Sequence, residues 1–219
     1  MNKFLSMLVL LICTNLATMF AQNTTLEVDN QYPGWLSSKI PFKDQASVQN
    51  LTVTGYINGT DVKFIRELIN NRQLSHLDLS DANIVAGGDA YYVVSKVSYK
   101  IYKDNTIGSY MFTTGYNSKL TYLSLPKSVT KINLDNRIDY CDDNLDTLVI
   151  GGDLKMLRSM DVCQTKKYLM IREGVDSLNA TNIQAKSVHL PTTIKYLDRK
   201  TFRIDTVKAN IENIDYFNK

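Results

Sequence analysis

The two histidines of this 219-residue chain are its best candidates for acid–base or metal chemistry. His76 and His189 each neighbour an apolar residue of a predicted β-strand, so we expect both side chains to point outward from a sheet. Five strand spacings of about 4.8 Å would separate them by some 24 Å, too far for one metal ion or one catalytic triad. We therefore expect each histidine to act alone at the surface.

The other sequence patterns that could indicate catalysis or ion binding are weak. Asp142, Asp143 and Asp146 precede a predicted strand, where carboxylates commonly cap or solubilise a turn, and we find no convergent set of oxygens for calcium. The sequence contains no glycine-rich phosphate loop, C-x-x-C pair, H-E-x-x-H or G-x-S-x-G motif. Two carboxylates could still meet in space for glycoside hydrolysis. We expect a non-enzymatic protein with no catalytic residue, metal or cofactor.

The elements that position these residues follow a repeated apolar pattern. Residues 120–132 read L-x-x-L-x-L-P-x-x-V-x-x-I, and similar strand anchors recur at Leu123, Leu148, Leu169, Val188 and Val207, separated by 25, 21, 19 and 19 residues. These spacings match leucine-rich repeats of about 20–29 residues. We predict an α/β solenoid, with a parallel β-sheet on one side and short helices and irregular segments on the other. Leu77 lies 46 residues before Leu123, which suggests two repeats.

The N-terminal part divides into a leader and a cap. Lys3, the apolar run 4–13 and Ala21 are typical of a signal peptide over residues 1–21, and no second apolar span follows. We predict a cap over 22–73 with a first strand at 51–53 and a helix from Thr60 to residue 70, then one continuous repeat region over 74–219. Trp35 is expected to anchor the core of the cap.

Composition and charge limit the partners. Hydrophobic residues make up 44% and charged residues 21%, which is typical of a globular chain. Loss of residues 1–21 removes Lys3 and no acid, so the net charge of +3 becomes +2. This nearly neutral net charge does not indicate nucleic-acid binding. The mature chain has no predicted transmembrane segment. We expect an exported protein that is secreted, periplasmic or attached to a cell surface, with a protein or glycan ligand.

Two segments resemble a known family. Ile107-Gly-Ser-Tyr-Met-Phe112 followed by residues 120–132, and Val188-His-Leu-Pro-Thr-Thr-Ile194, resemble the BspA-type leucine-rich repeats of bacterial surface proteins. That family repeats I-G-x-x-A-F and then L-x-x-I-x-L-P-x-S-V-x-x-I. The resemblance covers roughly residues 74–219 and departs at Gly151-Gly152-Asp153, where the proline is absent. It implies an adhesin or binding protein.

The resemblance also bears on the two cysteines left after residue 21. The family often places a cysteine about six residues before the first strand leucine, and Cys163 and Cys141 lie six and seven residues before Leu169 and Leu148. Neighbouring strands lie about 4.8 Å apart and a disulfide spans Cα atoms about 5–6 Å apart, so a bridge is geometrically reasonable. The alternative, a ladder of two buried thiols, agrees with the family's usual use of this position.

The outward side chains of the predicted sheet are the candidate binding surface, because repeat curvature makes that side an extended groove. The strand alternation selects His76, Asp78, Tyr122, Ser124, Tyr168, Met170, His189 and Lys208. A solvated face with no ligand is the alternative.

Two further readings remain open. The tyrosines of residues 91–102, interspersed with lysines, favour either strand packing or a glycan surface. Ile211 and Ile214 near the chain end favour assembly through the last repeat.

Overall fold

The computed structural model describes residues 24–71, 73–112, 118–132, 145–158, 167–179, 183–197, 202–208 and 215–216. In chain order these residues form the following elements: β1 (Thr24–Asn30), α2 (Leu36–Lys39), α3 (Phe42–Gln45), β2 (Val48–Ile57), α4 (Gly59–Asn71), β3 (His76–Asp78), β4 (Ala82–Ile84), β5 (Gly87–Val94), β6 (Val97–Ile101), β7 (Thr106–Ile107), β8 (Tyr122–Ser124), β9 (Lys131–Ile132), β10 (Thr147–Ile150), β11 (Met156–Arg158), β12 (Tyr168–Ile171), β13 (Ser177–Asn179), β14 (Ile183–His189), β15 (Tyr196–Leu197), β16 (Phe202–Lys208) and β17 (Asp215–Tyr216).

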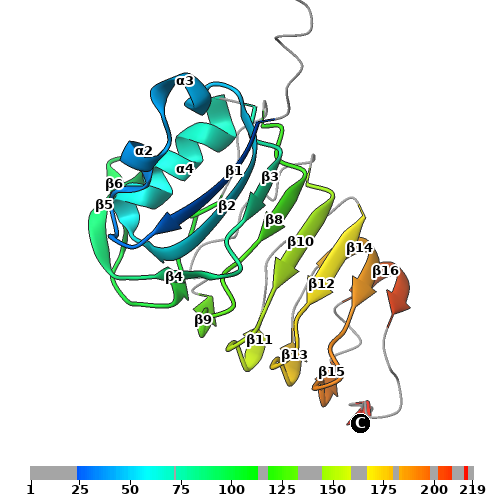
Figure 1. The fold of residues 1–219 in the computed structure, drawn as a ribbon. Coiled ribbons are helices and arrows are strands. Elements are labelled where there is room, and N and C mark those ends of the chain that lie inside the picture. The colour runs from blue at the N-terminus through cyan, green and yellow to red at the C-terminus, as the bar shows by residue number, and fades with distance from the viewer. Residues whose placement is uncertain are drawn as a thin grey trace, which may run out of the picture.

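A large parallel β-sheet dominates the described residues. Its strands follow the order β1-β2-β3-β8-β10-β12-β14-β16, and β4 pairs with β2 in addition (Figure 1). Every ladder in this sheet is parallel. With few helices, the chain is a β-rich α/β protein. The prediction of a parallel sheet is confirmed.

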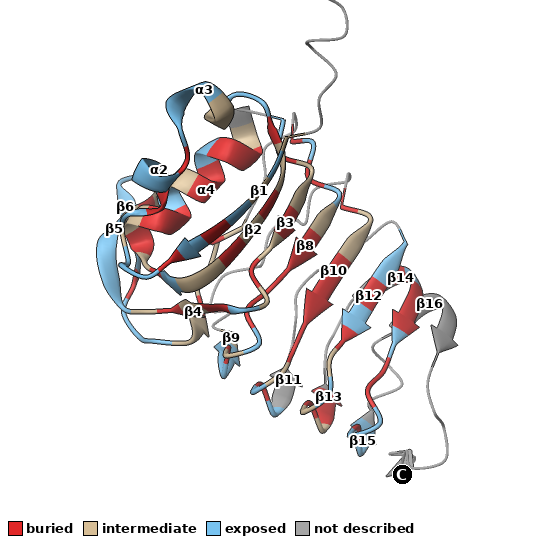
Figure 2. Cartoon of the chain, in the orientation of Figure 1, coloured by how far each residue is buried: buried red, intermediate tan, exposed pale blue. Residues whose placement is uncertain are grey.

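The predicted strand anchors occupy one row of this sheet. Each pairs directly with the next, in the order Leu51, Leu77, Leu123, Leu148, Leu169, Val188 and Val207. The anchors from Leu51 to Val188 are buried in the hydrophobic core (Figure 2). Alternation along each strand turns these side chains to one side of the sheet, so neighbouring strands share one apolar interior.

Shorter strands form a second parallel sheet. Strands β11, β13, β15 and β17 pair in that order, and each follows a strand of the main sheet along the chain. Glycines allow the turns between the two sheets to approach closely. Gly152 and Gly174 have φ of +120° and +103°, and a Cβ at either would collide with a neighbouring backbone carbonyl, that of Lys127 or Gly152 respectively. Gly151, which occupies the position of the proline in the pattern, has φ of +97°, a value that proline cannot adopt.

The spacing between β3 and β8 does not reflect two repeats. Leu77 and Leu123 are 46 residues apart in sequence but are direct neighbours in the sheet. After β4, which pairs with β2, the intervening chain leaves the main sheet and forms an antiparallel hairpin from β5 and β6. The expectation of an extra strand between them is wrong, because part of this segment covers α4 instead.

The N-terminal cap contains a strand that the sequence did not reveal. Residues 24–30 form β1, which pairs with β2 from Thr24 to Asn30, so the strand at 51–53 is the second in the chain. The helix predicted from Thr60 to residue 70 is observed as α4. Its cap is Asn58 rather than Thr60, because the Asn58 side chain accepts from the Thr60 N–H at 2.9 Å and the Asp61 carboxylate accepts from the Asn58 N–H at 2.9 Å.

Exposure of one cap residue also differs from expectation. Trp35 was expected in the core but is 58% exposed, and its ring lies 5.4 Å from that of Tyr32. Leu36 takes the buried position instead. Arg66 of α4 is buried, because the hairpin covers it and places the Tyr92 ring 4.4 Å from its guanidinium carbon.

Candidate functional site

The predicted binding residues lie in two rows across the face of the main sheet opposite the strand anchors. The strand register aligns His76 with Tyr122, and both lie in the row of Thr147 and Tyr168. The second row contains Asp78, Ser124, Val149, Met170, His189 and Lys208. The structure therefore brings all eight predicted positions to one face. The side chain of Lys208 is outside the described structure.

The His76 and Tyr122 rings stack face to face. Their centroids are 3.9 Å apart and the planes differ by 5°. Both residues are consequently half-buried, although each belongs to the outward row. Partial burial lowers the pKa of His76, while the nearby Asp78 carboxylate opposes this shift.

Ser124 is not available to a ligand. It is 1% exposed, because Arg172, which follows β12, extends back across β10 and covers it. The guanidinium donates to Ser124 Oγ at 2.5 Å and to the Leu125 carbonyl at 2.7 Å. Val149, which lies on β10 in the same row, is also buried. The prediction of Ser124 as a free contact residue is wrong for this reason.

Arg172 joins this cluster to Asp78. Although burial alone would raise the pKa of Asp78, hydrogen bonds from Ser80 and Ser124 and the charge of Arg172 hold the pKa below its ordinary value. The Ser80 N–H donates to Asp78 Oδ1 at 2.8 Å. Burial lowers the pKa of Arg172, with Asp78 as the main opposing charge. Asp78 is half-buried and its carboxylate accepts the Ser80 N–H, so only part of it is open to a ligand.

Only a weak feature of the sequence points to Arg172. It stands directly after the buried Ile171, where a strand ends and a long side chain can fold back over its neighbours. Its guanidinium forms hydrogen bonds to Leu125 and Ser124, which lie 47 and 48 positions earlier in the chain. No local sequence pattern predicts contacts at that separation.

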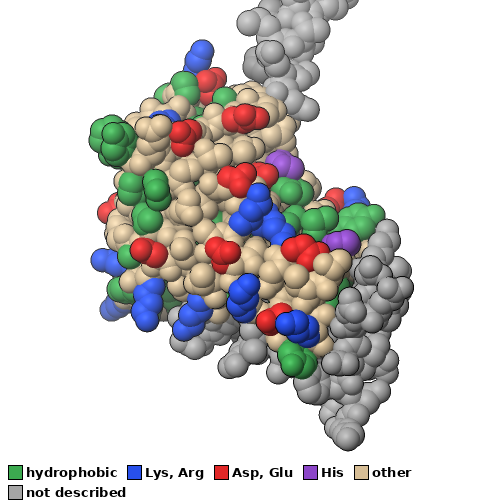
Figure 3. All heavy atoms as spheres, turned by 60° about the horizontal axis from the view of Figure 1, so that its bottom comes forward, with side chains coloured by type: hydrophobic (Ala, Val, Ile, Leu, Met, Phe, Trp, Pro, Cys, Tyr) green, Lys and Arg blue, Asp and Glu red, His purple; other side chains and the backbone are tan. Residues whose placement is uncertain are grey.

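The far end of the face is uncovered. Tyr168 is 50% exposed, Met170 is 44% exposed and His189 is exposed. Figure 3 shows hydrophobic side chains gathered between the two histidines on this surface. Met170, His189 and Arg172 border an open hollow of about 700 Å³ that charged side chains of both signs complete, among them Lys127, Asp153 and Glu173.

The arrangement offers no metal centre within the described residues, where no group of three or more histidine, cysteine or acidic side chains converges. His76 and His189 lie on β3 and β14, four strand positions apart, which corresponds to about 19 Å. This is shorter than the five spacings expected from the sequence, since β3 and β8 are neighbours. The two histidines still cannot act on one metal or one substrate atom.

The tyrosines of residues 91–102 differ in burial and do not form one exposed surface. Tyr91 is buried, and its hydroxyl donates to the Ser109 carbonyl at 2.8 Å. Burial raises the pKa of Tyr91 to about 12. Tyr92 and Tyr99 pack partly against the core, whereas Tyr102 is 76% exposed. The strand-packing interpretation holds for the first three, and only Tyr102 remains for a ligand.

Other predicted features lie outside the described residues. These are the leader at residues 1–21, Cys141, Cys163, Ile211 and Ile214. Among the helices that are described, none combines the length and apolar character that crossing a membrane requires.

No protein-family model matches the chain, and no curated protein matches it.

The stacked histidine should make stability depend on pH. Because the pKa of His76 is lowered in the folded chain, the unfolded chain binds more protons once the pH falls below the ordinary value of about 6.5. We expect the free energy of unfolding to decrease as the pH is lowered through this range, and His76→Phe to remove part of that decrease while keeping an aromatic ring beside Tyr122. Urea unfolding at pH values on either side of 6.5 measures both effects. Equal pH dependence in the two proteins would contradict the prediction.

Proposed function

We propose that this chain is an exported leucine-rich repeat protein of the BspA type that recognises a partner without catalysing a reaction. Support comes from the direct pairing of equivalent apolar positions from Leu51 to Val207, which is the arrangement that repeats need to share one core. A second source of support is the alternation, from β10 onward, between a strand of the main sheet and a strand of the shorter sheet. On this proposal the protein acts outside the bacterial cytoplasm.

The recognition surface in this proposal is the uncovered end of the sheet face. The single observation that carries it is the exposure of Tyr168, Met170 and His189, beside the half-buried His76–Tyr122 stack. Aromatic residues and methionine are enriched at the centres of protein interfaces, where they bury large areas at low entropic cost.

The surroundings of this surface favour a protein partner. The strands of the main sheet hold the contact residues in fixed register, so little ordering is needed on binding. The hollow beside Met170 and His189 could receive a side chain of the partner, and the charges of both signs at its border suit the polar rim of a protein interface.

Removal of the Tyr122 and Tyr168 rings tests this surface. We expect the double variant Tyr122→Ala and Tyr168→Ala to bind its protein partner about tenfold to a hundredfold more weakly, because alanine removes two interface anchors. The chain would be immobilised and exposed to surface-protein extracts of candidate host cells. Captured proteins would be identified by mass spectrometry and titrated in purified form against each variant.

Phe42→Ala provides the matched control. Phe42 lies in α3 of the cap and is highly exposed, so this variant removes an aromatic ring away from the sheet face. It should bind the captured partner with unchanged affinity. Circular dichroism and the unfolding midpoint would establish that each variant is folded. If folded variants bind every captured protein as wild type does, the sheet face is not the recognition surface.

A further inference from the structure

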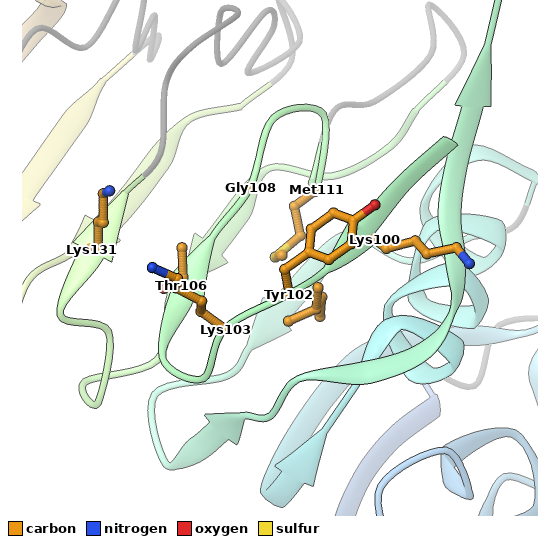
Figure 4. A pocket seen from close by; sticks show the side chains of 8 residues that line it. Lys100, Tyr102, Lys103, Thr106, Gly108, Met111 and Lys131 are labelled. Atoms are coloured by element: carbon orange, nitrogen blue, oxygen red, sulfur yellow. The ribbon is translucent and has the colours of Figure 1, made fainter. Parts of the chain in front are cut away.

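A small pocket lies outside the main sheet, where the end of β6 meets the loop before β7 and strand β9. It measures about 160 Å³, and its described lining includes Lys100, Ile101, Tyr102, Lys103, Met111 and Lys131 (Figure 4). Pockets for drug-sized ligands are commonly about 300–1,000 Å³, so this one has room for a single small unit. None of its residues belongs to the face described above.

The charge of this pocket is positive. Lys100, Lys103 and Lys131 contribute three ammonium groups, and no aspartate or glutamate is among the described lining residues. Within the described part of the chain, none of these lysines forms a salt bridge. The nearest acid in sequence, Asp104, is not among the lining residues, and its carboxylate accepts from the Ala86 N–H at 2.7 Å. The pocket therefore favours an anionic ligand.

The centre of the pocket is apolar and aromatic. Ile101 and Met111 are buried beneath it, and the Tyr102 ring is 76% exposed. In Figure 4, Lys103 and Lys131 lie on one side of the Tyr102 ring and Lys100 extends on the other. A ligand that places an apolar ring face on Tyr102 can thus direct anionic groups to both sides. Sugar rings have such faces of C–H groups.

The backbone holds this arrangement before any ligand arrives. The Asn105 N–H donates to the Ile84 carbonyl at 2.8 Å, and the Asn105 carbonyl accepts from the Thr130 N–H at 2.9 Å. The loop that carries Tyr102 and Lys103 is thereby tied to β4 and to the residue before β9. A fixed loop loses little conformational freedom when a ligand binds.

We propose that this pocket binds one unit of an acidic saccharide, a sugar chain that carries carboxylate or sulfate groups. Tyr102 packs against the sugar ring, and Lys103, Lys131 and Lys100 bind its anionic groups and those of the adjoining units. A single-stranded nucleic acid fits less well, because such ligands bind successive aromatic side chains in a strongly basic groove. This pocket has one exposed aromatic ring, that of Tyr102, and the chain has a net charge of only +3.

Titration of the chain with defined oligosaccharides tests this proposal. A heparin-derived hexasaccharide provides sulfate groups, a galacturonic acid hexasaccharide provides carboxylates alone, and a dextran oligosaccharide of equal length is neutral. We expect one or both acidic probes to bind, with affinity that falls as sodium chloride is raised, and no binding of dextran. The double variant Lys103→Glu and Lys131→Glu should bind at least about tenfold more weakly. Tyr102→Ala should also bind several-fold more weakly.

Lys43→Glu and Phe42→Ala are the controls. Lys43 is an exposed lysine of α3 far in sequence from the pocket, so its reversal tests for attraction by net charge alone. Both controls should keep wild-type affinity for the acidic probe. The proposal is overturned if neither acidic saccharide binds, if Lys43→Glu weakens binding as much as the pocket variant, or if Tyr102→Ala has no effect. Tighter binding of an oligothymidylate than of both saccharides would overturn it as well.

Discussion

Leu123→Ala is expected to lower the free energy of unfolding by about 2–5 kcal/mol. Leu123 is buried in β8 and lies between Leu77 and Leu148 in the strand register. Alanine would remove the contacts to both neighbouring strands and leave a cavity that strands fixed by ladder hydrogen bonds cannot close. Urea unfolding followed by circular dichroism measures the loss.

Tyr168→Ala is the matched control for this prediction. Tyr168 belongs to the same sheet but is half-exposed on the opposite face, so its truncation should change the free energy of unfolding by no more than about 0.5 kcal/mol. A loss below about 1 kcal/mol for Leu123→Ala would mean that the row of apolar residues does not form one shared core.

Asp61→Ala is expected to cost about 3 kcal/mol or more. The Asp61 carboxylate is buried and accepts from three backbone N–H groups, those of Gly34 at 2.5 Å, Leu36 at 2.9 Å and Asn58 at 2.9 Å. Alanine leaves these donors without an acceptor, and each such loss costs about 1–3 kcal/mol. It also removes the acidic partner of the cap of α4.

The chain's single tryptophan gives this prediction a local readout. Trp35 lies between Gly34 and Leu36, which Asp61 holds in place, so release of the loop should alter the fluorescence anisotropy of Trp35 before global unfolding. Asp61→Asn keeps one acceptor oxygen and should fall between wild type and Asp61→Ala. Asp153→Ala, which removes an exposed carboxylate, should have almost no effect. A fully stable Asp61→Ala would show that water replaces the carboxylate at this site.

The elements that follow from local patterns were predictable. The recurrence of the apolar pattern every 19–25 residues predicted that the strands at Leu123, Leu148, Leu169, Val188 and Val207 are neighbours, because each repeat adds one strand to the sheet. The apolar spacing around Ile65 and Leu68 likewise defined α4. The alternation of side chains along each strand assigned the candidate binding residues to a common face.

Features that depend on distant residues were not predictable. The strand β1 has a largely polar sequence and is ordered by pairing with β2. The separation of 46 positions between Leu77 and Leu123 suits two repeats, and only tertiary packing turned part of this segment into a hairpin over α4. Exposure of Trp35 follows from the buried carboxylate of Asp61, which holds the loop on both sides of the ring.

The sequence by itself determined the parallel strands, through an apolar pattern that recurs every 19–25 residues, and the direction of their side chains, through the two-residue period along each strand. Tertiary structure decided which of the outward residues a partner can touch. Arg172 covers Ser124, and the Tyr122 ring stacks on His76, while Tyr168, Met170 and His189 remain accessible. The physical reason is that accessibility depends on the long side chains of neighbouring strands, which lie close in space and far apart in sequence.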